Sequence, residues 1–266
     1  MSSVLPTAIF ALSIDLELDP LKIENGQPRS LEATTQRLVK LLDRLRVPAT
    51  WAVADPAVSA ATEVLLAAGA GHEIAILGDP TWVGQQAGRA RFGRELARRV
   101  AHAKAAGIAI STLALRGTEL ADSLDLAVKQ DISVVRPNFR EGSGGWFSRP
   151  VSRTPAAIRF GLWDVPASMR LPCSSRWKFG GGGRRQARSG IDSAIANRGV
   201  FQIQVDALTL SDRGNMAEHI LEQILRHAID RQRQGSLEIG TLATVARKLA
   251  GDRTVSPARS ILHSAA

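Results

Sequence analysis

Apolar residues along this chain occur either in short continuous runs or at helical spacing, and the first of the continuous runs is near the N-terminus. Residues 8–14 are almost wholly apolar, and the run ends in Asp15 and Glu17. An apolar run of this length, bounded by prolines, predicts a strand buried on both faces. The strand carries two carboxylates to its C-terminal end, the edge where functional side chains gather in α/β proteins. The alternative is that both residues only end the strand and begin a polar loop.

Strand-like runs then alternate with amphipathic stretches of helical period. The runs that predict strands are residues 8–14, 49–54, 72–77, 108–115, 132–135, 160–165 and 199–206, with a short extended piece at 237–239. The helical patterns cover residues 31–46, 55–68, 88–106, 119–130, 188–197, 216–231 and 241–250. This alternation predicts a parallel α/β architecture, and the pattern alone leaves both a barrel and a doubly wound sheet open.

Composition limits the class of protein. The 266 residues are 44% hydrophobic, and we expect one domain over residues 1–250 with a flexible, basic tail over 251–266. No segment approaches the roughly 18 consecutive apolar residues of a membrane span. The N-terminus has no signal-peptide pattern, and a lone Cys173 excludes an intramolecular disulfide. These features predict a cytoplasmic protein without a membrane partner.

The net charge of +9 raises the question of an anionic partner. The basic residues are scattered over helix faces, and the chain has no tyrosine, so platforms for base stacking are scarce. Nucleic acid is therefore not the expected partner. A basic module that binds an anionic polymer, such as nucleic acid or an acidic polysaccharide, stays as an alternative.

Several segments, in order, resemble the polysaccharide deacetylase (NodB-homology) family. They are residues 13–18 (Ser-Ile-Asp-Leu-Glu-Leu), 48–51 (Pro-Ala-Thr-Trp), 71–74 (Gly-His-Glu-Ile), 115–116 (Leu-Arg), 161–166, 199–206 and 237–242. The resemblance spans roughly residues 8 to 250 and implies a deformed (β/α) barrel of about seven strands, with the site at the strand C-termini.

The resemblance also implies a chemistry. An active member removes an acetyl group from an N-acetylated sugar, using water activated by a metal that one aspartate and two histidines hold. A second aspartate acts as base, and a late histidine protonates the leaving amine. Asp15 matches the base, and Arg116 matches the arginine that orients it.

The chain departs from the family at the decisive positions. Leu16 replaces the metal aspartate, and the two metal histidines correspond to Leu77 and Thr81. The late histidine positions read Gln202 and Asp206. His72 belongs to the framework stretch, and we expect it to face away from the site. A conventional zinc deacetylase is therefore not expected, and no cofactor is predicted.

Three hypotheses follow. The first is a degenerate deacetylase of carbohydrate metabolism that binds an N-acetylated sugar or a protein partner without catalysis. The second is an active carbon–nitrogen hydrolase with a metal-free or rebuilt site, and the third is the polymer-binding module. Candidate catalytic residues are Asp15, Arg116 and Asp206, and candidate substrate-binding residues are Glu17, Asp79, Trp82, Gln202 and Trp163. A divalent cation, if one binds, would use the carboxylates of Asp15, Glu17, Asp79 and Asp206, a set that suits magnesium or manganese.

Of the tryptophans, Trp51 and Trp163 lie within strand-like runs, where packing in the core is the simpler explanation. Trp82 follows the loop that begins at Asp79, and we expect it to face a ligand. A sugar ring would stack on an indole in that position.

Overall fold

The computed structural model describes residues 5–16, 31–68, 71–120, 123–139, 154–171, 182–212 and 215–251. The predictions for Glu17, Cys173 and the 251–266 tail beyond its first residue lie outside these ranges. The strands are β1 (Ala8–Leu16), β2 (Thr50–Val53), β3 (Glu73–Gly78), β4 (Thr112–Leu115), β5 (Val134–Arg136), β6 (Ala156–Ala157), β7 (Trp163–Asp164), β8 (Met169–Leu171), β9 (Val200–Asp206) and β10 (Leu237–Gly240). The helices are α1 (Leu31–Leu45), α2 (Ala60–Ala68), α3 (Arg89–Ala105), α4 (Leu124–Val128), α5 (Gly182–Ala196), α6 (Ala207–Asp212), α7 (Asn215–Arg233) and α8 (Leu242–Gly251).

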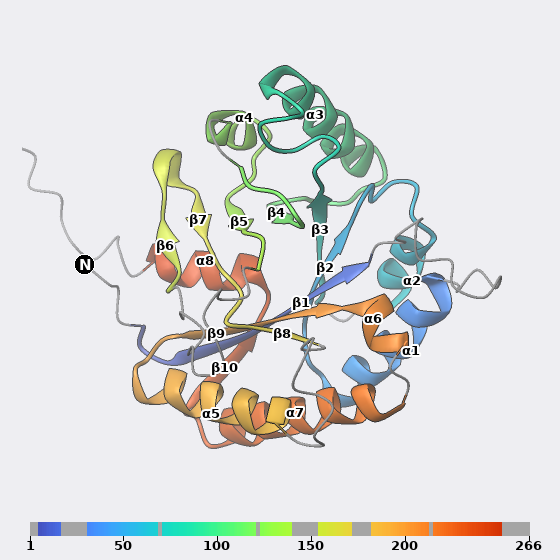
Figure 1. Ribbon diagram of the computed structural model, residues 1–266. Helices are drawn as coiled ribbons and strands as arrows, with labels where there is room; N and C mark the ends of the chain where they lie inside the picture. The colour runs from blue at the N-terminus through green and yellow to red at the C-terminus, as the bar shows by residue number, and fades with distance from the viewer. Residues whose placement is uncertain are drawn as a thin grey trace, which may run out of the picture.

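The strands form one curled sheet with helices packed around it (Figure 1). The order is β6-β7-β5-β4-β3-β2-β1-β9-β8, with β10 paired to the first half of β1, and every pairing except β6 with β7 is parallel. The predicted deformed (β/α) barrel is confirmed, and each of the seven predicted strands is present. The sequence pattern missed β6 and β8, because two or three residues are too few to show a period of two. It also placed the start of α5 at about residue 188, whereas the helix begins at Gly182.

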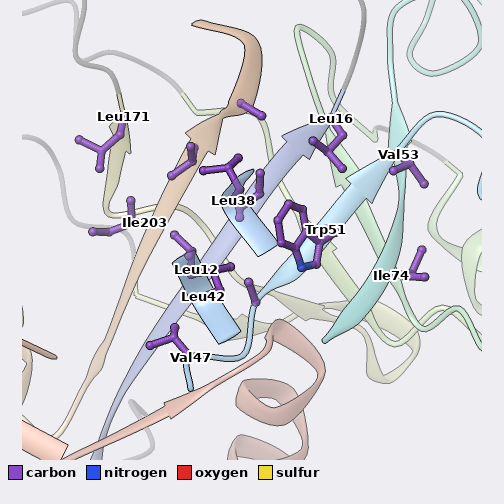
Figure 2. Close-up of a cluster of buried hydrophobic side chains, with 14 of the residues drawn as sticks. Leu12, Leu16, Leu38, Leu42, Val47, Trp51, Val53, Ile74, Leu171 and Ile203 are labelled. Carbon is purple, nitrogen blue, oxygen red and sulfur yellow. The ribbon is translucent and has the colours of Figure 1, made fainter. Parts of the chain in front are cut away.

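The two faces of β1 have different neighbours. Leu12 and Leu16 face outward and pack with Leu38 and Leu42 of α1, beside the indole of Trp51 (Figure 2). Burial of one such leucine contributes about 1.5–3 kcal/mol, so this outer layer holds the helices on the sheet. Ser13 and Asp15 alternate with the leucines and therefore face the interior of the barrel.

The interior is apolar at its base and polar toward the C-terminal ends of the strands. At the base, Ile9, Ala11 and Val134 pack with α8, whose apolar residues close this end of the barrel. The helix contacts both β1 and β5. Because the base is filled by side chains, any access to the polar end is from the C-terminal side of the strands. Within the described part of the chain, no helix has the length and apolar composition to cross a bilayer.

Glu73 fixes α8 to the sheet. Its carboxylate accepts hydrogen bonds from Thr50 Oγ1 (2.8 Å), Ser111 Oγ (3.4 Å), Thr112 Oγ1 and the backbone N–H of Ala243 (3.0 Å). Thr50 Oγ1 accepts the N–H of Leu242, the first residue of the helix (2.9 Å). A carboxylate at a helix N-terminus satisfies N–H groups that have no partner within the helix. The glutamate of the 71–74 segment is thus structural.

His72, the neighbour of Glu73, faces away from the barrel interior, as expected. Its Nδ1 accepts the backbone N–H of Ala49 (3.1 Å), and its ring meets Trp51 edge-on at 5.6 Å. Nε2 lies 3.7 Å from Asp43 Oδ1. Burial lowers the pKa of His72 below its ordinary 6.5, and the opposing effect of Asp43 is smaller.

The lowered pKa of His72 predicts acid sensitivity. Below pH 6.5 the unfolded chain takes up a proton at this residue more readily than the folded chain does, so the free energy of unfolding should fall as the pH drops through that value. His72→Asn keeps a hydrogen-bond acceptor for Ala49 but does not titrate, and should flatten the dependence measured by urea unfolding between about pH 7.5 and pH 5. His219→Asn, an exposed change on α7, is the control and should behave as wild type. An unchanged slope in His72→Asn would contradict this prediction.

Candidate active site

Two carboxylates lie side by side at the polar end of the barrel. Asp15 at the end of β1 is the register partner of Asp206 at the end of β9. Register partners on parallel neighbours point to the same side of a sheet, and their strands are about 4.8 Å apart. Both side chains are buried. The structure therefore brings together the two aspartates that the sequence singled out.

Asp15 is held by residues from two other strands. Arg136 Nη1 lies 2.8 Å from Asp15 Oδ1 and donates a hydrogen bond to Ser13 Oγ (2.8 Å). Gln204 Nε2 donates to Asp15 Oδ2 (2.7 Å). The contact at Oδ1 is an ion pair without hydrogen-bond alignment, so Oδ1 has no hydrogen-bond donor among the described residues. One oxygen of Asp15 thus keeps its capacity to accept a proton or a hydrogen bond.

Arg136 reaches Asp15 by crossing the barrel from β5 to β1. Three strands separate β5 from β1. In register, Arg136 is level with Ala114 of β4 and Leu77 of β3, whereas Asp15 is level with Ala52 of β2 and Ala75 of β3. The three alanines have short side chains, and the guanidinium is 0% exposed. A large residue at any of the three positions would occupy the path of the arginine.

Asp206 carries a second set of arginines. Its Oδ2 lies 3.5 Å from Arg116 Nη2 and 3.3 Å from Arg170 Nη2, and both guanidiniums are only partly buried. Its Oδ1 accepts the backbone N–H of Thr209 (2.9 Å) in α6, which begins at the next residue. Arg116 thus contacts Asp206, and the arginine paired with Asp15 is Arg136. The family resemblance predicts an arginine beside Asp15 at position 116, and among the described residues the arginine in that place is Arg136.

Asp79 does not join the two buried aspartates. Its Oδ1 accepts hydrogen bonds from the backbone N–H (2.7 Å) and the hydroxyl of Thr81, which closes the turn after β3. This geometry is typical of an aspartate that stabilises its own loop. The expectation that Asp79 binds a substrate or a cation has no support in these contacts.

The expectation for Trp82 is wrong. The turn at Asp79 directs the indole toward α3, where it is 1% exposed, stacks on Phe92 at 5.9 Å and lies 4.4 Å from the guanidinium carbon of Arg99. Trp163, also proposed to bind substrate, is buried in the apolar base with Ile9 and Val134. Neither indole forms a surface on which a sugar could stack. Trp51 is in the core, as predicted.

Gln202 lies on the interior face of β9, one layer below Gln204. It is the register partner of Ala11, and its side chain is fully buried. Neither its Oε1 nor its Nε2 has a hydrogen-bond partner among the described residues, and the same holds for Gln204 Oε1. Polar atoms buried without partners are uncommon in proteins and point to a site that binds something polar.

The donor set does not fit a zinc ion of the deacetylase type. Leu77, at one histidine position, is buried among alanines, and Thr81, at the other, is bonded to Asp79. In the ranges that the structure describes, no three histidine, cysteine, aspartate or glutamate residues come together to hold a metal. Asp15 and Asp206 each face arginine rather than a second free carboxylate, so these two residues suit a cation poorly as well.

Arg136, Arg170 and Gln204 are site residues that the sequence analysis missed. A signal for two of them was present: Arg136 ends an apolar strand, as Asp15 does, and Gln204 alternates with apolar residues between Gln202 and Asp206. Both patterns place a polar side chain on the face of the sheet that carries Asp15. Arg170 gave no such signal, because its strand has three residues.

The basic helix α3 is neutralised in part by its neighbours. Arg89 pairs with Asp125, Arg98 contacts Asp55 and Glu95, and Arg99 also pairs with Glu95. The pair of Arg89 with Asp125 is among the more exposed of these, and such pairs contribute at most about 1 kcal/mol. Polymer binding through this surface stays a prediction.

Comparisons with known proteins place the fold. No protein-family model matches the sequence, and no curated protein matches it. Among solved structures, a putative polysaccharide deacetylase from Mycobacterium smegmatis superposes with a TM-score of 0.65 at 17% identity, over 93% of this chain and 91% of that one. The chain has the polysaccharide-deacetylase fold. A probable polysaccharide deacetylase from Pseudomonas aeruginosa PAO1 gives 0.66 at 14% identity, covering 90% of each chain.

The peptidoglycan deacetylase PdaC from Bacillus subtilis is a more distant match. It aligns with a TM-score of 0.51 at 13% identity, over 94% of this chain and 95% of its own. All three likenesses confirm the fold that the family resemblance implies. At such identities they establish the polysaccharide-deacetylase fold alone, and the chemistry of the site has to be argued from its residues.

Proposed function

We propose that this protein binds an N-acylated carbohydrate at the C-terminal ends of β1 and β9 and does not use histidine-bound zinc. The observation that carries the proposal is the donor set at this edge of the barrel. The positions corresponding to the metal histidines are Leu77 and Thr81, while Asp15 and Asp206 stay together beneath three arginines. Polar, buried and partly unpaired groups of this kind favour a hydroxyl- and amide-bearing ligand.

The fold supports the class of ligand. Solved structures with this fold are described as polysaccharide deacetylases, and the site lies at the strand ends where parallel α/β barrels bind their ligands. The carboxylates accept hydrogen bonds from sugar hydroxyls, and the arginines donate to carbonyl oxygens. Carbohydrate binding without metal catalysis requires nothing beyond the residues present.

Titration calorimetry in the presence of EDTA tests this proposal. We expect saturable binding of N-acetylglucosamine or its trisaccharide, at least tenfold weaker for Asp206→Asn, because that change alters the carboxylate between Arg116 and Arg170. Asp192→Asn, a partly exposed aspartate on α5 that contacts His227 and Arg231, is the matched control and should bind as wild type. In a parallel titration without EDTA, added zinc should change neither affinity. Zinc-dependent release of acetate, or equal affinities in the two variants, would overturn the proposal.

A second candidate is metal-free amide hydrolysis, favoured by Oδ1 of Asp15, which is ion-paired with Arg136 but has no hydrogen-bond donor among the described residues. As a base, this oxygen would take a proton from water as the water oxygen adds to the acyl carbon. The carbon–nitrogen bond then breaks, and the amine leaves with that proton while the acyl group departs as an acid. Release of a primary amine in EDTA that disappears in Asp15→Asn would support it. No release from wild type after prolonged incubation would leave binding alone.

A further inference from the structure

The strongest unexplained feature of the site is that two nitrogens of the Arg136 guanidinium have no hydrogen-bond partner among the described residues. Nη1 serves Ser13 and Asp15, whereas Nε and Nη2 are buried without a hydrogen-bond partner among the described residues. Nε–H and the adjacent Nη2–H point the same way and form the side-on fork with which arginine binds two oxygens at once. Leaving a charged donor buried and unpaired costs more than the 1–3 kcal/mol of a neutral group. An acceptor with two oxygens would remove this cost.

Other side chains on the same face of the sheet also carry polar atoms without a hydrogen-bond partner among the described residues. Ser13, which Arg136 touches, is the register partner of Gln204, whose Oε1 is unpaired, and Gln202 lies on the same face with both amide atoms unpaired. Asp15 Oδ1, which lies 2.8 Å from Nη1 of the same guanidinium, lacks a hydrogen-bond donor. A ligand oxygen pair on the fork would therefore have hydroxyl-binding groups on the same face of the sheet, an arrangement that suits a sugar acid.

We propose that the ligand carries a carboxylate, which binds the fork of Arg136 formed by Nε and Nη2. The inference rests on the ligand binding proposed above and names one chemical group of that ligand. A carboxylate is planar and has two oxygens at the spacing of the fork, which a single hydroxyl or a neutral acetamide lacks. The ligand class is then a uronic acid or a related sugar acid, with its hydroxyls near Asp15 and Gln202.

Glucuronate and glucose are the matched probes, because they differ only in the carboxylate. Each is titrated into the protein by calorimetry in EDTA at constant ionic strength set with sodium chloride. We expect glucuronate to bind at least tenfold more tightly than glucose. Equal affinities would overturn the inference.

N-acetylglucosamine, measured in parallel, separates the two proposals. If it binds while glucuronate binds no more tightly than glucose, the sugar site stands and the carboxylate subsite fails. If glucuronate alone binds, the subsite stands and the N-acyl preference fails.

Arg136→Lys locates the subsite. Lysine keeps a positive charge for Asp15 but lacks the fork, so the ratio of glucuronate affinity to glucose affinity should fall at least tenfold, whatever the change in glucose affinity itself. Arg91→Lys, an exposed position on α3, is the control and should show no change. If Arg136→Lys does not fold, the crystal structure of the wild type soaked in glucuronate decides: the carboxylate on Nε and Nη2 supports the inference, and ordered water there with glucuronate elsewhere overturns it.

Discussion

Arg136→Met should lower the free energy of unfolding by about 3–5 kcal/mol, the largest loss we expect from one substitution in this protein. The arginine is 0% exposed, and its guanidinium lies 2.8 Å from the carboxylate of Asp15. Its removal leaves the aspartate charge uncompensated in the interior, where water cannot solvate it. Urea unfolding at neutral pH, followed by circular dichroism, measures the loss.

The double variant Asp15→Asn/Arg136→Met separates this effect from lost packing. Because it removes both charges, it should recover much of the stability, and the double-mutant cycle should give a large coupling energy between the two positions. Arg91→Met, which removes an exposed arginine from α3, should change stability by less than about 0.5 kcal/mol. An unfolding midpoint of Arg136→Met equal to that of wild type would show that the pair contributes nothing.

Glu73→Ala should cost about 3 kcal/mol, because this one carboxylate accepts hydrogen bonds from three side chains and from the N-terminus of α8. The loss should be local as well as global. Hydrogen exchange at the amide of Ala243 should become faster by a larger factor than exchange in β9. The helix loses its attachment to β3, whereas β9 keeps its backbone hydrogen bonds with β1.

Glu238→Ala is the matched control for Glu73→Ala. Glu238 joins the same helix to β10 through an ion pair with Lys248, and the side chains of Lys248 and Glu238 are 41% and 34% exposed. Its loss should therefore cost less than about 1 kcal/mol. If the two substitutions cost the same, the buried carboxylate would not be the group that holds α8.

The fold was predictable because each of its main strands is a buried apolar run. Residues 8–14 and 199–206 are long enough to identify alone, and together with the helical stretches between them they indicate a parallel sheet. The closing of that sheet into a barrel came from the family resemblance. The short strand β8 could not be predicted in this way, because it is formed through its pairing with β9 and its own sequence is too short to show a pattern.

The candidate site was predictable only where a residue ends a long strand. Asp15 and Asp206 were found in this way, and the register of β1 with β9 brings them together. Arg136 was missed because its partner lies across the barrel, 121 positions back in sequence, and side-chain reach is not visible in a linear pattern. Trp82 was misplaced for a related reason, since the turn made by Asp79 and Thr81 decides where the indole points.

The place of β1 in the sheet has a consequence for how the molecule is made. This strand leaves the ribosome before all three of its neighbours, and two of them, β9 and β10, are near the other end of the described chain. The hydrogen bond from Gln204 to Asp15 closes a separation of 189 residues. Contacts so distant in sequence slow folding, and until they form the two apolar faces of β1 stay uncovered. The strand that organises the barrel is therefore the segment of the nascent chain for which we expect the greatest need of a chaperone.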